Sequence, residues 1–118
     1  MPCPKRILVV DDEPIVCDAM TMLLSHDGHQ IVQAHGGTEA LAELEATHFD
    51  LVFTDFKMPR MNGAELARAI HEKYPDKPVV MVTAFPPKSL PSQVTVVLVK
   101  PLNWQSIREA IAQVTGTS

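Results

Sequence analysis

The sequence predicts an α/β domain in which a parallel β-sheet is covered by helices on both faces. Short apolar runs rich in Val and Ile recur along the chain almost without charge, which is typical of strands buried on both faces. Between them lie segments whose apolar residues recur at helical spacing, so that strands and helices alternate. Because 118 residues, 46% of them hydrophobic, suffice for one core, we expect a single domain over residues 1–118.

The first half of the chain contains two strand–helix units. Pro14 follows an apolar run and an acidic cluster, and proline suits the first turn of a helix. Gly28 suits the end of that helix, and Gly36-Gly37 separates the next strand from the next helix. The predicted elements are a strand at residues 7–10, a helix at 15–25, a strand at 30–34 and a helix at 38–46.

The second half continues the alternation, with one exception between its last two strands. Asn62-Gly63 marks a loop before a helix, and Asn103 suits the N-cap of the last helix. The predicted elements are strands at residues 51–54, 79–83 and 94–99, and helices at 64–73 and 103–114. The helical side chains expected to face the core are Val16, Met20, Leu23, Ala40, Leu41, Leu44, Leu66, Ala69, Ile70, Trp104, Ile107 and Ile111.

Composition excludes several classes of function. A formal net charge of −4 argues against binding to nucleic acid or a membrane surface, because both require a basic field. No apolar run approaches the roughly 20 residues of a membrane span, and no signal-peptide pattern opens the sequence, so we expect a cytoplasmic protein. Cys3 and Cys17 are expected to be reduced thiols, and the five histidines to lie at the surface.

Chemically active residues follow the predicted strands at their carboxyl ends. Asp11 and Asp12 follow the first strand, Asp55 the third, Thr83 ends the fourth, and Lys100 follows the fifth. Because the carboxyl ends of parallel strands meet at one edge of a sheet, we expect these five residues to converge there.

Three carboxylates held close together repel one another unless a cation neutralises them. Oxygen ligands without His or Cys favour Mg²⁺, with Mn²⁺ as a second candidate. In phosphoryl transfer, the Asp55 carboxylate suits a nucleophile that forms an acyl phosphate. The Lys100 ammonium and the Thr83 hydroxyl suit contacts to the phosphoryl oxygens.

Several motifs, in order at the strand ends, resemble the receiver domain of two-component response regulators. They are Asp11-Asp12, Thr54-Asp55-Phe56-Lys57-Met58-Pro59 with Asn62-Gly63 behind it, Val82-Thr83-Ala84 and Lys100-Pro101. The resemblance covers nearly the whole chain. It implies a flavodoxin-like (βα)5 fold, a doubly wound parallel sheet with strand order 2-1-3-4-5.

The same resemblance implies a signalling role rather than an enzyme. Asp55 would receive a phosphoryl group from a sensor histidine kinase or a histidine phosphotransfer protein, and an unidentified protein target would respond. Asp12 and Asp55 would bind the metal directly, Asp11 would act mainly through water, and Lys57 would contribute its backbone carbonyl. The Lys100-Pro101 peptide bond is expected to be cis.

The sequence departs from this family between its last two strands. Three prolines within residues 84–93 forbid a regular helix, so we expect the fourth helix to be shortened or replaced by a proline-rich loop. Val97 stands where the family often has a switching aromatic residue. We therefore expect the loop, through Phe85, to relay an inward movement of Thr83. Phe85 and Lys57 are also candidates for setting a long acyl-phosphate lifetime.

Two other functions remain open. One is an interaction module that works without phosphorylation, which the altered helix-four region favours. The other is an aspartyl-phosphate phosphatase, which needs a second acid two residues after the nucleophile, where this sequence has Lys57. Dimerisation through the helix-poor face also remains open.

Overall fold

The computed structural model describes residues 4–84, 94–100 and 103–115, and these ranges form five strands and four helices. In chain order the elements are β1 (Arg6–Val10), α1 (Pro14–Ser25), β2 (Gln30–Ala34), α2 (Gly37–Ala46), β3 (Leu51–Asp55), α3 (Gly63–Lys73), β4 (Val79–Thr83), β5 (Val96–Val99) and α4 (Trp104–Thr115). The predicted alternation is confirmed, with boundaries that differ by one or two residues.

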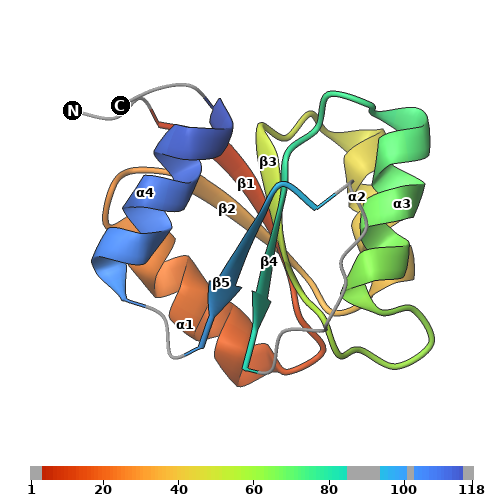
Figure 1. The fold of residues 1–118 in the computed structure, drawn as a ribbon, viewed down its shortest axis with the longest axis horizontal. Coiled ribbons are helices and arrows are strands. Elements are labelled where there is room, and N and C mark those ends of the chain that lie inside the picture. The colour runs from red at the N-terminus through yellow and green to blue at the C-terminus, as the bar shows by residue number, and fades with distance from the viewer. Residues whose placement is uncertain (1–3, 85–93, 101–102, 116–118) are drawn as a thin grey trace.

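The five strands form one parallel sheet in the order β2-β1-β3-β4-β5, as expected. In the register of the sheet Val10 lies beside Thr54 and Asp55 beside Val82. The last residues of the inner strands are therefore level with one another. The arrowheads of β4 and β5 in Figure 1 point toward this edge, at the bottom of the view.

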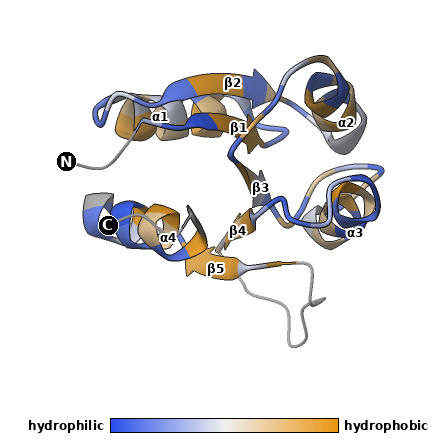
Figure 2. Cartoon of the chain, turned by 90° about the horizontal axis from the view of Figure 1, so that it is seen from above, coloured by the Kyte–Doolittle hydropathy of each residue, from blue (hydrophilic) through white to orange (hydrophobic). Residues whose placement is uncertain are grey.

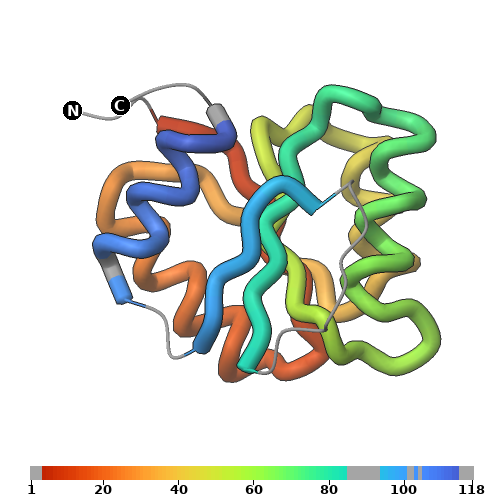
Figure 3. The backbone as a smooth tube through the Cα atoms, viewed as in Figure 1, coloured from red at the N-terminus to blue at the C-terminus, as the bar shows by residue number. Residues whose placement is uncertain are grey.

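Helices cover both faces of the sheet, α1 and α4 on one side and α2 and α3 on the other (Figures 1 and 2). Alternate residues of β1 show this arrangement, because Ile7 and Val9 pack in the core beneath α1 and α4, and Leu8 and Val10 in the core beneath α2 and α3. Figure 3 shows the first and last helices side by side. Arg108 of α4 donates two hydrogen bonds of 2.8 Å to Asp27, just after α1.

Local sequence signals explain where the helices begin and end. Gly28, with a φ of +84°, takes a left-handed conformation three residues after the end of α1, and its N–H donates to the Ser25 carbonyl. Asn62 and Glu65 form a reciprocal capping box at the start of α3. Asn103 accepts a hydrogen bond from the Ser106 N–H and caps α4 as predicted.

The inward faces of two helices differ from the prediction. On α1, Val16 and Leu23 face the core as expected but are only partly buried, and the most buried residues are Cys17, Met20 and Leu24. On α3 the buried alanine is Ala67 rather than Ala69. An apolar stripe on a helix is wider than its contact with the sheet, so the final rotation depends on packing that the periodicity does not contain.

One histidine is also placed differently. His29 is 6% exposed, and its Nδ1 accepts a hydrogen bond from the Lys5 N–H at 2.9 Å, so its predicted surface position is wrong. Burial lowers the pKa of His29, which keeps the imidazole neutral and able to accept that bond. Cys17 is a free, buried thiol, as expected for a reduced cysteine.

The last strand, predicted at residues 94–99, begins two residues later, at Val96. Thr95 still pairs with β4, since its N–H donates to the Val79 carbonyl at 2.8 Å. Within the described residues no helix stands between β4 and β5. The proline-rich connection, Phe85 and the Lys100-Pro101 bond lie outside the described residues.

Candidate functional site

Three carboxylates meet at the carboxyl edge of the sheet. One oxygen from each of Asp11, Asp12 and Asp55 lies within 4.8 Å of the others, although the residues come from two strand ends far apart in sequence. Asp11 and Asp55 are buried and Asp12 is exposed. The predicted convergence of the acids is confirmed, and the exposed member leaves the group open to solvent on one side.

Lys100 reaches the same group from the end of β5. Its Nζ lies 3.6 Å from Asp55 Oδ1 and 3.7 Å from Asp11 Oδ2. Its backbone N–H donates to the Thr83 carbonyl at 2.9 Å, which extends the β4–β5 pairing past the last strand residue and aims the side chain at the acids. One ammonium therefore faces three carboxylates, and the site keeps an excess of negative charge.

Burial of these acids changes their protonation. Burial raises the pKa of Asp11 to about 6, against the opposing effect of the hydrogen bond from the Glu13 N–H. Burial also raises the pKa of Asp55, and the nearby Lys100 charge opposes that rise. Without a cation, crowded buried carboxylates tend to take up a proton. A hard divalent cation can replace the proton as the neutralising charge. The donor set thus fits Mg²⁺.

Thr83 and Lys57 lie beside this group. Thr83 is the last residue of β4, one position beyond Val82, which is the register partner of Asp55, and it is buried. The Lys57 side chain is exposed. Thr83 therefore lies at the same edge of the sheet as the carboxylates, and Lys57 lines the cleft beside Asp12.

An open cleft of about 370 Å³ adjoins the carboxylates. Its lining residues are Asp12, Phe56, Lys57, Met58, Pro59 and Asn62. Most of them belong to the loop between Asp55 and α3. Of the three acids, Asp12 lines this cleft, so the cleft opens to solvent beside the exposed member of the group.

Sequence reasoning missed how tightly the backbone around Asp55 is held. A Cβ atom at Gly63 would lie 2.3 Å from the Asp55 carbonyl oxygen, and the Gly63 N–H donates to the Phe56 carbonyl at 2.8 Å. The Thr54 hydroxyl donates to the same Asp55 carbonyl at 3.0 Å. Asn62-Gly63 signals a turn in the sequence, but nothing local indicates that the turn touches Asp55.

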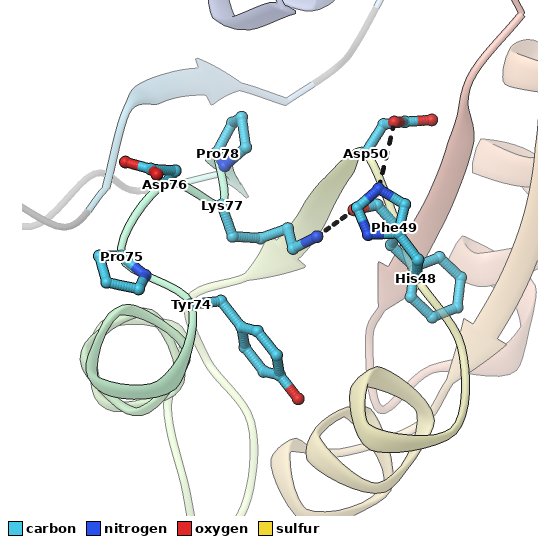
Figure 4. A pocket seen from close by; sticks show the side chains of 8 residues that line it. All are labelled: His48, Phe49, Asp50, Tyr74, Pro75, Asp76, Lys77 and Pro78. Carbon is cyan, nitrogen blue, oxygen red and sulfur yellow. Dashed lines mark hydrogen bonds and ion pairs between the residues drawn. The ribbon is translucent and has the colours of Figure 1, made fainter.

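A second concavity, of about 350 Å³, lies at the opposite end of the strands (Figure 4). Lys77 reaches across it and donates to the Phe49 carbonyl, and His48 faces Asp50. The Tyr74 hydroxyl donates to the Leu44 carbonyl at 3.2 Å. These two hydrogen bonds join the α3–β4 connection to α2 and to the segment that follows α2. Lys77 and Tyr74 therefore have structural partners within the chain.

Comparison with known proteins agrees with this geometry. The family model described as the response regulator receiver domain matches residues 7–112. The transcriptional regulatory protein GlrR of Escherichia coli is 31% identical over 115 residues, which cover 92% of this chain and 26% of GlrR. This chain thus spans about a quarter of that relative's length.

Solved structures agree in fold. The response regulator protein TrrA of Thermotoga maritima, in complex with Mg²⁺ and BeF, is 34% identical with a TM-score of 0.87, over 93% of this chain and 98% of TrrA. A CheY-like response regulator receiver domain protein from Methanospirillum hungatei is 30% identical with a TM-score of 0.89, over 97% of this chain and 95% of that one. Both likenesses extend over nearly the full length of the chains compared.

Proposed function

The chain belongs to the response regulator receiver domain family, and from this premise we propose that Asp55 is its phosphoacceptor. The observation that supports this most is the position of Lys100 Nζ, 3.6 Å from the Asp55 carboxylate within a group of three acids. A nucleophilic carboxylate, a neutralising ammonium and a site for a divalent cation are the parts that phosphoryl transfer requires.

The reaction is an in-line transfer between two proteins. An oxygen of the Asp55 carboxylate attacks the phosphorus of a phosphohistidine on a sensor histidine kinase or a histidine phosphotransfer protein. The new P–O bond makes an acyl phosphate as the P–N bond breaks, and the leaving imidazole takes up a proton. Receiver domains obtain their phosphoryl group from sensor histidine kinases, and the particular donor for this chain is part of the proposal.

Asp12 and Asp55 would hold Mg²⁺ directly, Asp11 mainly through water, and the Lys57 carbonyl would complete the protein ligands. When bound, the ion supplies positive charge beside the transferring phosphoryl oxygens. The relative TrrA was crystallised with Mg²⁺ and BeF, which supports the same ion for this chain. Mn²⁺ meets the same oxygen donors and is the second candidate.

Lys100 and Thr83 would bind the phosphoryl group itself. The ammonium of Lys100 neutralises one phosphoryl oxygen, and the Thr83 hydroxyl donates a hydrogen bond to another. Their shared backbone hydrogen bond links the ends of β4 and β5, so that both groups move together with the sheet edge. An inward pull on Thr83 would be passed to residues 84–93 and from there to a downstream protein target.

Phosphorylation with a small donor tests this function. Acetyl phosphate or phosphoramidate with Mg²⁺ is expected to modify the wild-type chain once, as measured by intact mass, and Asp55→Asn to remain unmodified. Asp76→Asn is the matched control, because Asp76 is an exposed acid at the other end of the strands. Equal modification of Asp55→Asn and wild type, or none of wild type, would contradict the proposal.

The same experiment separates the alternative functions. An interaction module that works without phosphate would not be modified, although it would keep its fold. A phosphatase would release phosphate from an added phosphoprotein, for which Lys57 is unsuitable because it carries no proton-accepting carboxylate. Addition of beryllofluoride with Mg²⁺ followed by measurement of mass in solution would show whether activation produces a dimer.

No helix among the described residues has the length and apolar character needed to cross a membrane. We propose a cytoplasmic location, where a phosphorylated kinase domain and reduced thiols are both available. Cell fractionation with an antibody to the chain tests the location.

A further inference from the structure

We propose that Thr54 is a positioning residue for the phosphoacceptor, because its hydroxyl holds the peptide plane between Asp55 and Phe56. The inference rests on the proposed function, since it assigns a role within the same site. Thr54 touches neither the phosphoryl group nor the metal in this proposal. It acts only through the backbone of its neighbour.

The hydroxyl of Thr54 has a defined partner in an apolar setting. Thr54 is 1% exposed on the penultimate position of β3, and its register partners on either side are Val10 and Met81. Its Oγ1 donates to the carbonyl oxygen of Asp55 at 3.0 Å. A buried hydroxyl is expensive to leave without a partner, so this hydrogen bond is strongly favoured over its loss.

That hydrogen bond fixes the next N–H as well. The Asp55 carbonyl and the Phe56 N–H belong to one planar peptide unit, so neither can rotate without the other. The Phe56 backbone N–H lowers the pKa of the Asp55 carboxyl, against the larger effect of burial. Holding the carbonyl on one side of the unit therefore also fixes the direction of the N–H on the other side, next to the residue proposed to attack phosphorus.

The start of α3 closes the unit from a second direction. Gly63 approaches the Asp55 carbonyl so closely that a Cβ atom would lie 2.3 Å from the oxygen, and its N–H donates to the Phe56 carbonyl. The peptide unit is thus held between the Thr54 hydroxyl and the first turn of α3. Without the hydroxyl, the peptide unit loses one of these two restraints and can rotate more easily.

Positioning of this kind affects rate more than fold. In-line attack depends on the place of the nucleophilic oxygen, and a displacement of about 1 Å can lower a rate about a hundredfold. Loss of one positioning hydrogen bond should have a smaller effect on the rate, and we expect phosphorylation to slow about five- to tenfold.

The test compares Thr54→Val, which removes the hydroxyl at nearly constant shape, with Thr54→Ser, which keeps it. Thr95→Val is the matched control, because the Thr95 hydroxyl also bonds to the backbone, accepting from the Val79 N–H, but at the far end of β4. Initial rates with acetyl phosphate and Mg²⁺ are measured well below the melting temperature of each variant. Urea unfolding of the same samples separates stability from rate, and Thr54→Ala replaces the valine variant if that does not fold.

We expect Thr54→Val to be slowed about five- to tenfold, and Thr54→Ser and Thr95→Val to stay within about twofold of wild type. Two results would overturn the inference: a wild-type rate for folded Thr54→Val, or an equal loss in Thr54→Ser. Both leave phosphorylation of Asp55 intact as a function. If wild type itself is not modified, the proposed function fails, and the positioning role fails with it.

Discussion

At the scale of single residues, the site depends on groups placed in states that they would not adopt in isolation. Asp11 is a carboxylate whose burial raises its pKa to about 6, and Arg60 is a non-glycine residue with a φ of +71°. The Met61 N–H donates to the Pro59 carbonyl across Arg60, which makes a tight three-residue turn. Both residues lie on loops beside the site, where an unfavourable local conformation or protonation state can be kept because the surrounding structure holds it.

The raised pKa of Asp11 predicts a pH-dependent metal affinity. A carboxyl group whose pKa in the folded protein lies above its ordinary value of 3.8 favours the protonated folded state at low pH, and this stabilisation is lost as the pH rises through about 6. Mg²⁺ requires the ionised form, so its dissociation constant should rise about tenfold for each unit below pH 6. Calorimetric titration with Mg²⁺ at pH values from about 5 to about 7 measures this dependence.

Asp11→Asn supplies the control for that titration. Its affinity for Mg²⁺ should be lower at neutral pH and should change less with pH in the same range, because one of the two buried acids with a raised pKa is absent. A wild-type affinity that stays constant between these pH values would show that Asp11 does not exchange its proton for the ion.

The backbone of Arg60 predicts a stabilising substitution. A left-handed conformation costs a non-glycine residue about 1–2 kcal/mol, whereas glycine adopts it freely but loses about 0.5–1 kcal/mol more on folding. Arg60→Gly should therefore raise the free energy of unfolding by about 0.5 kcal/mol, measured with urea. Arg60→Ala keeps the unfavourable φ and should give no gain. A gain of equal size in both variants would point to the lost charge instead.

At the scale of elements, two helix starts approach the β3–α3 loop through glycines. Gly37 of α2 lies against Met61, where an added Cβ would be 2.5 Å from the flexible Met61 sulfur. Gly63 of α3 lies against the Asp55 backbone, which cannot move aside. The two distances are similar, but a Cβ at Gly37 would displace a flexible side chain, whereas a Cβ at Gly63 would displace backbone atoms.

These contacts predict opposite tolerance to the same substitution. Alanine normally stabilises a helix relative to glycine by up to about 1 kcal/mol. Gly63→Ala should instead destabilise the protein by about 2 kcal/mol and slow phosphorylation, because the new methyl group displaces the backbone of Asp55. Gly37→Ala should change stability by less than about 1 kcal/mol and leave the rate unchanged, because Met61 can adopt another rotamer.

Urea unfolding and acetyl-phosphate kinetics on the two variants distinguish these outcomes. A neutral Gly63→Ala would mean that α3 can withdraw from Asp55 at little cost. A slow Gly37→Ala would mean that Met61, rather than Gly63, determines the position of the loop.

At the scale of the whole molecule, the site draws charge from strands that are distant in sequence, so occupancy of the site is coupled to folding. Asp12 and Asp55 come together only when β1 and β3 are paired, and Lys100 joins them only when β5 is paired with β4. An unfolded chain has no such arrangement and should bind Mg²⁺ weakly. Any ion that binds the folded state alone must stabilise it.

Thermal unfolding tests this coupling. At a Mg²⁺ concentration ten times the dissociation constant, the free energy of unfolding should rise by about 1.4 kcal/mol, and the melting temperature should rise with it. Asp12→Asn should remove most of the increase, because it lacks one of the two carboxylates proposed to bind the ion directly. A rise of equal size in both proteins would indicate nonspecific screening of the net negative charge.

The order of strands and helices along the chain, and the acids and lysine that meet at one edge, could be predicted from the sequence alone. Uncharged Val-rich runs, Pro14, Asn103 and the glycines at helix ends are local signals, and local signals specify elements. The acids and the lysine could be assigned to one edge because parallel strands end together, which is a rule of topology and needs no coordinates.

How these parts contact one another depends on the folded arrangement. The burial of His29, the choice of Ala67 over Ala69, and the contact of Gly63 with Asp55 all arise from packing between segments far apart in the chain. The bond from Thr54 to the Asp55 carbonyl is local in sequence, but its geometry depends on where the sheet ends. Periodicity describes one element at a time, whereas these contacts exist only when several elements share a core.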